Sequence, residues 1–416
     1  MIGTSLFQGR WWVVFASFLG LIVSQGTITT FAFGIFLKPV SEDLGLSRGI
    51  FSLTNGLLSI ICAIFIPIVG ILVDRYGIRT VLMPMIVLFA LTTASLSYLQ
   101  SSLILLFGLF ALQGLFAASQ VPTGYAKAIS AWFDRDRGLA LGIAMAGVGL
   151  GVALMPQFLT YMIQNYGWRI AYIGLGVAVI VFAFVPVALF IRESPSPAVP
   201  QRGMRPDLID GLSLDEVVKR SWRFWAMNVA FFLAVMAIQG TITHVVALLT
   251  DRGIPVQTAA GAISVAGLAL IAGRILSGFC VDRFFAPYVA VFFFVCPIVG
   301  IALLLSGAAG SVPLVGTVLC GLGAGAEVDL MAFFVGRYFG LRAFGAIYGL
   351  MFAIFLIGSG LGAYVMGLCF DLTHSYTPML IVFVGALAIA SLLVARLGPY
   401  RFPVATPAPS LAAVAA

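Results

Sequence analysis

Long hydrophobic segments recur along the whole chain, and short polar stretches separate them. These segments hold 19–26 residues each, enough for a helix to cross about 30 Å of hydrocarbon at about 1.5 Å per residue. Twelve spans are predicted, over 12–37, 50–73, 80–98, 103–126, 139–163, 168–191, 225–250, 259–281, 287–307, 311–335, 344–368 and 376–395. The pattern therefore predicts an all-α polytopic membrane protein with twelve transmembrane helices.

The chain divides into two similar halves. The polar stretch 192–223 separates six spans from six, and its Ser213 is followed three residues later by Glu216, which predicts a capped surface helix. Three short segments recur in the same order in both halves: EDLGL (42–46) as TDRGI (250–254), GILVDR (70–75) as GFCVDR (278–283), and GVGLG (147–151) as GSGLG (358–362). A 6+6 repeat is typical of transporters in which two halves rock around a site near the middle of the membrane.

Four regions follow from this division. We expect an N-terminal six-helix bundle over 1–191, a cytoplasmic central loop with a short surface helix over 192–223, a C-terminal six-helix bundle over 224–396, and a disordered cytoplasmic tail over 397–416.

Composition and charge agree with a membrane protein and predict its orientation. The chain is 62% hydrophobic and only 9% charged, which excludes a soluble globular protein. If the N-terminus is inside, Lys38, Arg48, Arg169 and Arg252 lie outside, Arg274 lies within a span, and every other Lys and Arg lies inside. By the positive-inside rule both termini are expected in the cytoplasm. The net charge of +7 therefore indicates orientation rather than a nucleic-acid partner.

One motif lies at the inner end of the second span. GILVDRYGIRTVL (70–82) resembles the signature loop of the major facilitator superfamily, with matching residues Gly70, Asp74, Arg75, Gly77 and Arg79. The resemblance implies that this loop acts as a conformational latch and does not touch the substrate.

A second motif opens the fifth span. AWFDRDRGLALGIAMAGVGLG (131–151) resembles the fifth-helix signature of the monocarboxylate transporters, with matching residues Trp132, Phe133, Arg135, Arg137, Leu139, Ala140, Gly142, Ala144, Ala146 and Gly147. Their first-helix signature is partly present in FQGRWWVV (7–14), and the resemblance extends equally to the bacterial oxalate/formate exchangers. It implies a 6+6 major facilitator fold in the bacterial inner membrane that moves a small organic anion by alternating access.

Three charged residues lie well inside the predicted spans: Arg274, Glu327 and Asp329. An arginine at a span centre costs about 2.5–3.5 kcal/mol on insertion scales, so it should face a cavity or a partner. Arg274 lies eight residues before Asp282, and Asp329 lies eight before Arg337, at the inner ends of their spans. Arg274 and Asp329 therefore share a depth, about 12 Å from the inner edge, where transporters of this architecture bind substrate.

Arg274 is the candidate anchor for a substrate carboxylate, because a guanidinium can donate two parallel hydrogen bonds to it. The resemblance implies the same role, since monocarboxylate transporters carry an arginine four residues before a glycine at this point, as Arg274 precedes Gly278. A structural ion pair with Asp329 or Glu327 is the alternative.

Proton handling must differ from that of the animal monocarboxylate transporters. They carry an aspartate where this chain has Leu270, and a lysine in the first helix near the position of Phe31. Glu327 and Asp329 are about 200° apart around a helix, so one can face the cavity and the other a neighbouring helix. We expect one of them to carry the coupled proton. Burial favours the protonated form of a carboxyl group, and a nearby arginine favours its ionised form. A permanent counter-ion of Arg274 is the alternative.

His244, at the outer end of the seventh span, is a further candidate for proton relay, and a solvated histidine is the simpler interpretation. Other side chains are candidates to bind substrate: Gln25, Ser119, Tyr125 and Tyr348 by hydrogen bonds, and Phe333 and Phe334 by shaping an apolar wall. Hydrogen bonds between helices are the alternative role for the polar ones.

The leading hypothesis is proton-coupled symport of a small monocarboxylate such as L-lactate or pyruvate, with no cofactor, metal or obligatory protein partner, and with membrane lipid around the bundle. The alternative is an organic-anion exchanger of the oxalate/formate type. A dicarboxylate would favour a second cation at the depth of Arg274, and Lys127 lies closer to the cytoplasm. The chain has no P-loop, H-E-x-x-H or G-x-S-x-G motif, so an enzyme is not expected.

Overall fold

The computed structural model describes residues 9–133, 137–191, 211–307, 311–340 and 342–402. The N-terminal half contains α1 (Arg10–Ile22), α2 (Phe33–Leu44), α3 (Arg48–Tyr76), α4 (Ile78–Ser95), α5 (Leu103–Ala117), α6 (Pro122–Trp132), α7 (Arg137–Val179) and α8 (Val185–Phe190). The C-terminal half contains α9 (Leu214–Arg220), α10 (Trp222–Asp251), α11 (Val256–Val281), α12 (Ala286–Leu305), α13 (Val312–Phe339), α14 (Phe344–Thr373) and α15 (Thr377–Ala395). Short π or 3-10 turns join α1 to α2, α5 to α6 and α7 to α8.

The prediction of twelve spans agrees with this structure. Eleven helical runs in the described residues are long and apolar enough to cross a membrane, and one of them, Ala140–Phe190, has 51 residues. That length is more than twice what a bilayer needs at about 1.5 Å per residue. The run is broken at Gly167, whose φ of 82° is not helical, so it holds the predicted fifth and sixth spans.

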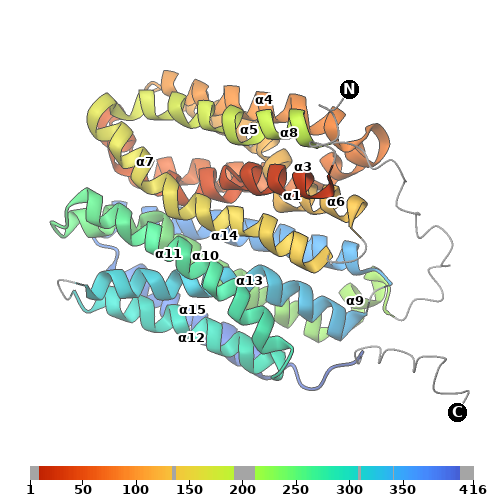
Figure 1. The fold of residues 1–416 in the computed structure, drawn as a ribbon. Coiled ribbons are helices and arrows are strands. Elements are labelled where there is room, and N and C mark those ends of the chain that lie inside the picture. The colour runs from red at the N-terminus through yellow and green to blue at the C-terminus, as the bar shows by residue number, and fades with distance from the viewer. Residues whose placement is uncertain (1–8, 134–136, 192–210, 308–310, 341, 403–416) are drawn as a thin grey trace, which may run out of the picture.

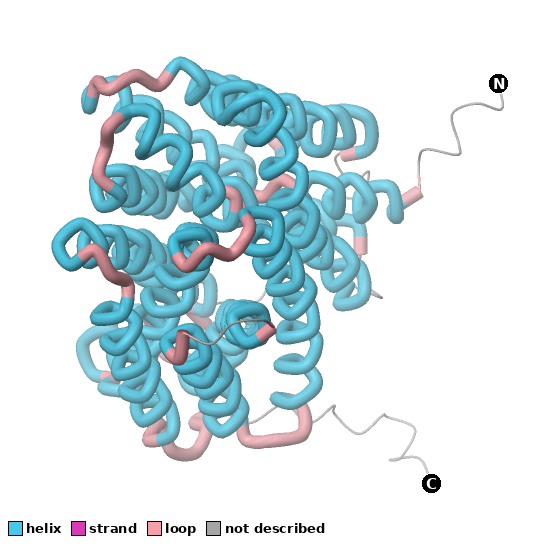
Figure 2. The backbone as a smooth tube through the Cα atoms, turned by 90° about the vertical axis from the view of Figure 1, so that its left-hand side faces the viewer, coloured by secondary structure: helices cyan, strands magenta, loops and turns pink. Residues whose placement is uncertain are grey.

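The two halves lie side by side, the N-terminal half above and most of the C-terminal half below in Figure 1. Contacts between the halves run mainly along two helix pairs, α3 with α14 and α7 with α11, and α2 also packs against α10. The helix ends form two faces: a terminal face, where α1 begins, α9 lies and the described chain ends, and an opposite face at the other end of the helices. Figure 2, seen from the opposite face, shows helices joined by loops.

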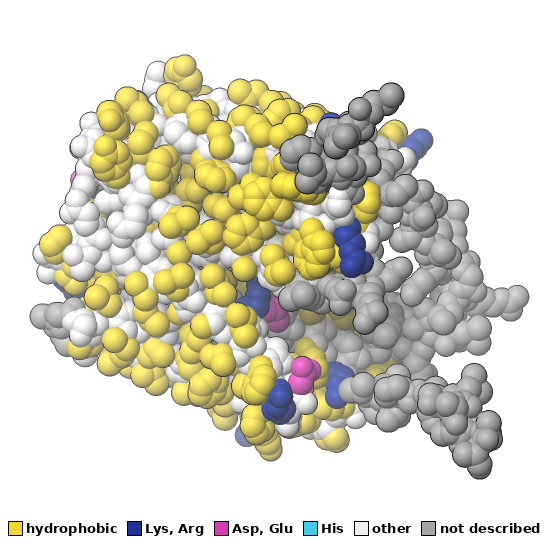
Figure 3. Space-filling view, viewed as in Figure 1, with side chains coloured by type: hydrophobic (Ala, Val, Ile, Leu, Met, Phe, Trp, Pro, Cys, Tyr) yellow, Lys and Arg dark blue, Asp and Glu magenta, His cyan; other side chains and the backbone are white. Residues whose placement is uncertain are grey.

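The sides of the bundle are apolar. In the space-filling view hydrophobic side chains cover most of the visible surface, and most of the basic side chains lie toward the terminal face (Figure 3). Large apolar residues such as Ile71, Ile104 and Leu372 are 66–89% exposed on the helices. A surface of this kind is stable against lipid and would associate in water.

Two segments at the terminal face show how the polar parts of the chain are fixed. Ser213 caps α9 and exchanges hydrogen bonds with Glu216, as expected, and these bonds lower the pKa of the Glu216 carboxyl. The tail differs from the prediction of disorder, since Leu397 is buried and the Tyr400 hydroxyl accepts a hydrogen bond from the Ala286 N–H at 2.7 Å. Residues 397–402 are therefore packed, and the rest of the tail lies outside the described residues.

Glycines allow the helices around the centre of the bundle to approach closely. A Cβ on Gly325 of α13 would overlap the backbone of Leu270 in α11, and one on Gly273 of α11 would overlap the backbone of Leu322 in α13. In α7, a Cβ on Gly147 or Gly151 would overlap the backbone of α1. Small residues at such crossings are typical of membrane helix packing. The close contact of α11 with α13 holds Arg274 and Asp329 next to each other.

We predict that Gly325→Ala lowers stability by about 1–3 kcal/mol, because the added methyl group forces α13 away from α11. Thermal unfolding of the purified protein in detergent measures the effect. Gly385→Ala in α15 is the matched control, since its Cβ would meet no atom within 4 Å. Equal melting temperatures for the two variants would contradict the close crossing.

Candidate functional site

An intramembrane ion pair lies between α11 and α13. The Nε of Arg274 is 3.0 Å from Oδ2 of Asp329, and the side chains are 23% and 40% exposed. Within the described residues no hydrogen bond occupies the two Nη nitrogens of Arg274. The pair is therefore accessible, and one edge of the guanidinium remains available to a ligand.

Glu327 points away from this pair. Its side chain is 1% exposed, and both carboxyl oxygens lack a hydrogen-bond partner. It lies one turn after Gly323, which packs against Phe293 of α12, and two turns before Phe334, which contacts Phe231 of α10. Glu327 therefore faces the interior of the C-terminal half, while Asp329 faces Arg274.

A cavity of about 310 Å³ lies between the two halves. It is lined by α3, α6 and α14, mostly by apolar side chains, and includes Ser119, Lys127 and Tyr348. Tyr348, in the wall of this cavity, interacts electrostatically with both Asp329 and Arg274. A second cavity, of about 340 Å³, is lined by Asp329 itself, with Ser277 and Phe333 among others.

The structure places the other predicted substrate residues away from these cavities. Gln25 is buried and donates a hydrogen bond to Thr29, one turn later. Tyr125 is fully buried and donates to the Gln120 side chain at 3.1 Å. Phe334 is also fully buried. Of the predicted substrate and proton-coupling residues, Tyr348 and Ser119 line the first cavity, Asp329 and Phe333 line the second, and Arg274 pairs with Asp329.

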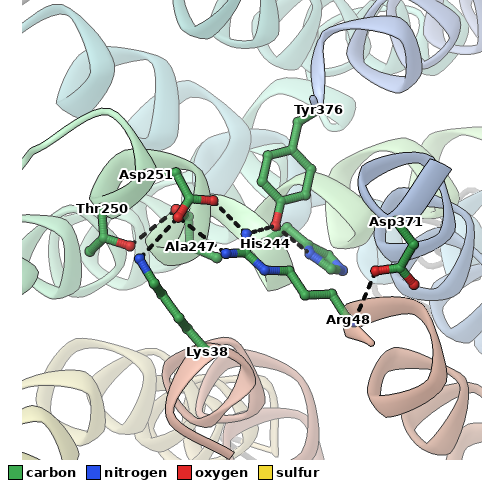
Figure 4. A network of polar contacts seen from close by, with 8 residues as sticks. All are labelled: Lys38, Arg48, His244, Ala247, Thr250, Asp251, Asp371 and Tyr376. Carbon is green, nitrogen blue, oxygen red and sulfur yellow. Dashed lines mark hydrogen bonds and ion pairs between the residues drawn. The ribbon is translucent and has the colours of Figure 1, made fainter. Parts of the chain in front are cut away.

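The opposite face is closed by polar contacts between the halves, drawn in Figure 4. Lys38 Nζ of α2 lies 3.0 Å from Asp251 Oδ1 at the end of α10, and Arg48 of α3 donates to the same oxygen at 3.1 Å. The backbone N–H groups of Arg48 and Gly49 donate to Asp371 of α14 at 3.0 and 2.7 Å. We call this group the closing network; it consists of Lys38, Arg48, Ser52, His244, Asp251, Asp371 and Tyr376.

His244 lies at the inner edge of the closing network and is fully buried, so the expectation of a solvated histidine was wrong. Its Nε2 is 2.9 Å from the Ala363 carbonyl oxygen of α14 and 3.1 Å from Ser52 Oγ of α3. Its Nδ1 is 3.5 Å from the Tyr376 hydroxyl, which accepts a hydrogen bond from Arg48 at 2.6 Å. This burial results from the packing of α10 against α3 and α14. It could not be predicted from the position of His244 at the end of a span.

The two helix pairs that join the halves diverge toward the terminal face. In the first pair, a Cβ on Gly49 or Gly360 would overlap the partner helix, whereas one on Gly70 or Gly349 would meet no atom within 4 Å. In the second pair, α7 and α11, a Cβ on Gly149 or Gly267 would overlap the other helix. A Cβ on Gly142 or Gly278 would meet no atom within 4 Å. The halves therefore touch at the opposite face and separate at the terminal face, where the cavity lies.

The predicted latch loop lies at this open end. Gly77, with φ of 87°, ends α3 and starts α4, and Arg79 donates to the Ala188 carbonyl oxygen at 2.7 Å. Gly70 lines the 310 Å³ cavity, and the Arg75 guanidinium lies over the Tyr76 ring at 5.3 Å. The Asp74 side chain is outside the described residues, so its predicted role in the turn stays a prediction.

These features define a class: a polytopic membrane protein of two six-span halves with a cavity between them that is closed at one face. Known proteins agree. The family model described as Major Facilitator Superfamily matches residues 14–363. The chain therefore belongs to the major facilitator superfamily, whose fold is the predicted 6+6 architecture.

Individual relatives are distant. The chain is 24% identical over 402 residues to the uncharacterized MFS-type transporter YcxA of Bacillus subtilis, covering 92% of this chain and 95% of that one. It is 25% identical to monocarboxylate transporter 11 of Mus musculus, covering 90% and 85%. It is 27% identical to monocarboxylate transporter 13 of Rattus norvegicus, covering 78% and 74%.

A solved structure shares the fold. It is a bacterial homologue of the human lysosomal transporter Spinster in an inward-facing, unoccupied conformation, and it superposes with a TM-score of 0.71 at 16% identity. The superposition covers 95% of this chain and 98% of that one. The named relatives are transporters, which agrees with a protein that is not an enzyme.

Proposed function

We propose that the protein is a proton-coupled symporter of a monocarboxylate that works by alternating access. The observation that carries this proposal is the Arg274–Asp329 ion pair, which is accessible, lies at mid-span and has Asp329 in the wall of the 340 Å³ cavity. Ionisable side chains within membrane spans mark substrate and proton pathways by default. The low-identity relatives named monocarboxylate transporters support the substrate class.

Arg274 acts as the anchor because its charge can be matched by only one carboxylate at a time. While Asp329 is ionised, it neutralises Arg274 at 3.0 Å. When a proton binds Asp329, the guanidinium is left without a counter-ion and attracts the carboxylate of a substrate. Substrate anion and proton then enter together, and the net charge of the site stays the same. This exchange of partners couples the two ligands without a second cation.

Glu327 contributes differently, because it does not face Arg274. A carboxylate without any hydrogen-bond partner in a fully buried site is costly, so we expect Glu327 to hold a proton in this conformation. Movement of α13 during the transport cycle would give that proton a path to the cavity. Asp329 is therefore the first candidate for coupling and Glu327 the second.

The positive-inside bias supports a cytoplasmic terminal face. The cavity is then open to the cytoplasm and the closing network seals the outer side. In this arrangement the substrate site is accessible from inside, and outward opening requires the closing network to separate. Transporters of this architecture alternate in this way around a fixed central site.

An exchanger of organic anions remains the second candidate, and one observation favours it. Lys127 lines the same cavity as Tyr348, so a second cation lies in the wall of this cavity. A dicarboxylate long enough to reach from Arg274 to Lys127 would use both. The transport assay below distinguishes the two mechanisms.

In proteoliposomes we expect an inward proton gradient to drive accumulation of labelled L-lactate or pyruvate, and a protonophore to abolish it. Proton symport requires this result, because the anion enters only with its proton. Uptake that ignores the gradient but needs a preloaded counter-anion would establish exchange instead.

Arg274→Lys should weaken transport about ten- to a hundredfold, since lysine keeps the charge and loses the paired hydrogen bonds to a carboxylate. Initial uptake rates over a range of substrate concentrations measure it. Arg396→Ala, an exposed arginine at the end of α15, is the control. Normal uptake by the lysine variant would remove Arg274 as the anchor.

Asp329→Asn should abolish gradient-driven accumulation and keep exchange of internal for external substrate, because the amide leaves Arg274 free and cannot carry the proton. Parallel measurements of accumulation and counterflow test this. Glu327→Gln tests the second candidate in the same way. If both variants still accumulate substrate in response to the gradient, the coupling group lies elsewhere.

A further inference from the structure

The closing network is balanced in charge only while His244 is neutral. Lys38 and Arg48 supply two positive charges, and Asp251 and Asp371 supply two negative ones, all joined directly. His244 is connected to these groups through the Tyr376 hydroxyl and is affected electrostatically by Arg48. A proton on His244 would therefore leave the network with one unmatched positive charge in a fully buried site.

Hydrogen bonding assigns the protonation of the ring. The Ala363 carbonyl oxygen can only accept, so the Nε2 that lies 2.9 Å from it carries the hydrogen. The Tyr376 hydroxyl accepts from Arg48, which leaves its own hydrogen to point at Nδ1 of His244. Nδ1 is thus the acceptor that completes the connection, and it is the atom that a proton would occupy.

A route to Nδ1 leads from the opposite face. A hollow of about 200 Å³ there is lined by Asp251, His374 and Tyr376 among others. Tyr376 lines this hollow and also faces His244, so its hydroxyl lies between the hollow and the buried ring. A proton from solvent in the hollow can reach Nδ1 through that hydroxyl.

We propose that His244 is a proton-binding site of the closing network, and that a proton taken up from the opposite face at Nδ1 separates the two halves there. Protonation turns Nδ1 from acceptor into donor, so the hydrogen of the Tyr376 hydroxyl loses its acceptor. It also places two cations, His244 and Arg48, on either side of one hydroxyl. Both effects weaken the contact of Arg48 in α3 with His244 of α10 and with Tyr376 before α15, and neither acts on the Arg274–Asp329 pair.

This inference rests on the proposed function for its direction, since it takes the opposite face to be the outer side. It adds a second proton site with a separate task. Protons at Asp329 allow substrate to bind, and a proton at His244 favours the conformation in which that site faces outward.

The test is a distance measurement across the opposite face. Nitroxide labels replace two exposed residues, Gln100 after α4 in one half and Thr377 at the start of α15 in the other, in a cysteine-free background. Pulsed electron resonance gives the distance distribution between about pH 8 and about pH 4, a range that covers histidine side chains in both exposed and buried sites. We expect a longer distance to become populated as the pH falls.

His244→Gln should lose this pH response, because glutamine can donate to Ala363 but does not gain a proton. Tyr376→Phe keeps the ring and removes the hydroxyl, so it should diminish the response even if the glutamine variant does not fold. His374→Asn is the matched control: His374 is the other histidine of the chain, lies at the same hollow, and has a positive φ that asparagine tolerates. A full response in His244→Gln, or none in the parent protein, overturns the proposal.

Gradient-driven uptake, measured on the same proteins, separates this inference from the proposed function. Uptake that follows the proton gradient while the label distance ignores pH would refute only the role of His244. A label distance that follows pH while uptake ignores the gradient would refute the proposed symport and leave the His244 site in place, as a pH-dependent opening of the carrier.

Discussion

The ion pair between Arg274 and Asp329 is the constraint on which the rest of the structure depends. A permanent positive charge in the middle of a span is unfavourable unless a partner or a cavity receives it. Here α11 and α13 cross so closely, through Gly273 and Gly325, that the two side chains meet at 3.0 Å. The same crossing leaves the pair partly exposed, so the arginine is stabilised without being shielded from a ligand.

The position of the cavity follows from how the halves meet. Glycines bring α3 against α14 and α7 against α11 near the opposite face, and the helices diverge from there. Polar contacts of the closing network hold together only the end at which the backbones already touch. A few charged groups near a water-exposed edge can therefore decide which face is shut, because they stabilise contacts only at the end where the halves touch. They do not act along the whole length of the helices.

Sequence predicted the spans well and the contacts between them poorly, for a physical reason. A bilayer fixes how long an apolar segment must be, so twelve spans can be counted from hydropathy alone. Equal spacing from the helix ends also placed Arg274 and Asp329 at one depth. By contrast, nearly every face of these helices is apolar, so hydropathy does not indicate that Tyr125 and Gln25 point into packed interfaces.

The closing network escaped prediction for the same reason. Lys38, Arg48 and Asp251 lie at the ends of spans, where charged residues are common. Their ion pairs join residues that are more than 200 positions apart in the sequence. Likewise the packing of Tyr400 at the terminal face depends on partners from α12 and α13. The repeat between the halves was the available signal, since EDLGL (42–46) lies between Lys38 and Arg48 and TDRGI (250–254) contains Asp251.

Two separate groups of titratable residues have different consequences for an alternating carrier. A single proton site at Asp329 would make substrate binding depend on pH. The equilibrium between the two conformations would then depend on pH only through the bound substrate. A site between the halves changes that equilibrium directly, because one of the two conformations breaks the hydrogen bonds that the proton disturbs. His244 touches both halves through Ser52 and Ala363, whereas Asp329 and Arg274 belong to the same half. In the proposed mechanism, ligand binding and the choice of conformation therefore depend on separate sites, and protons can act on each.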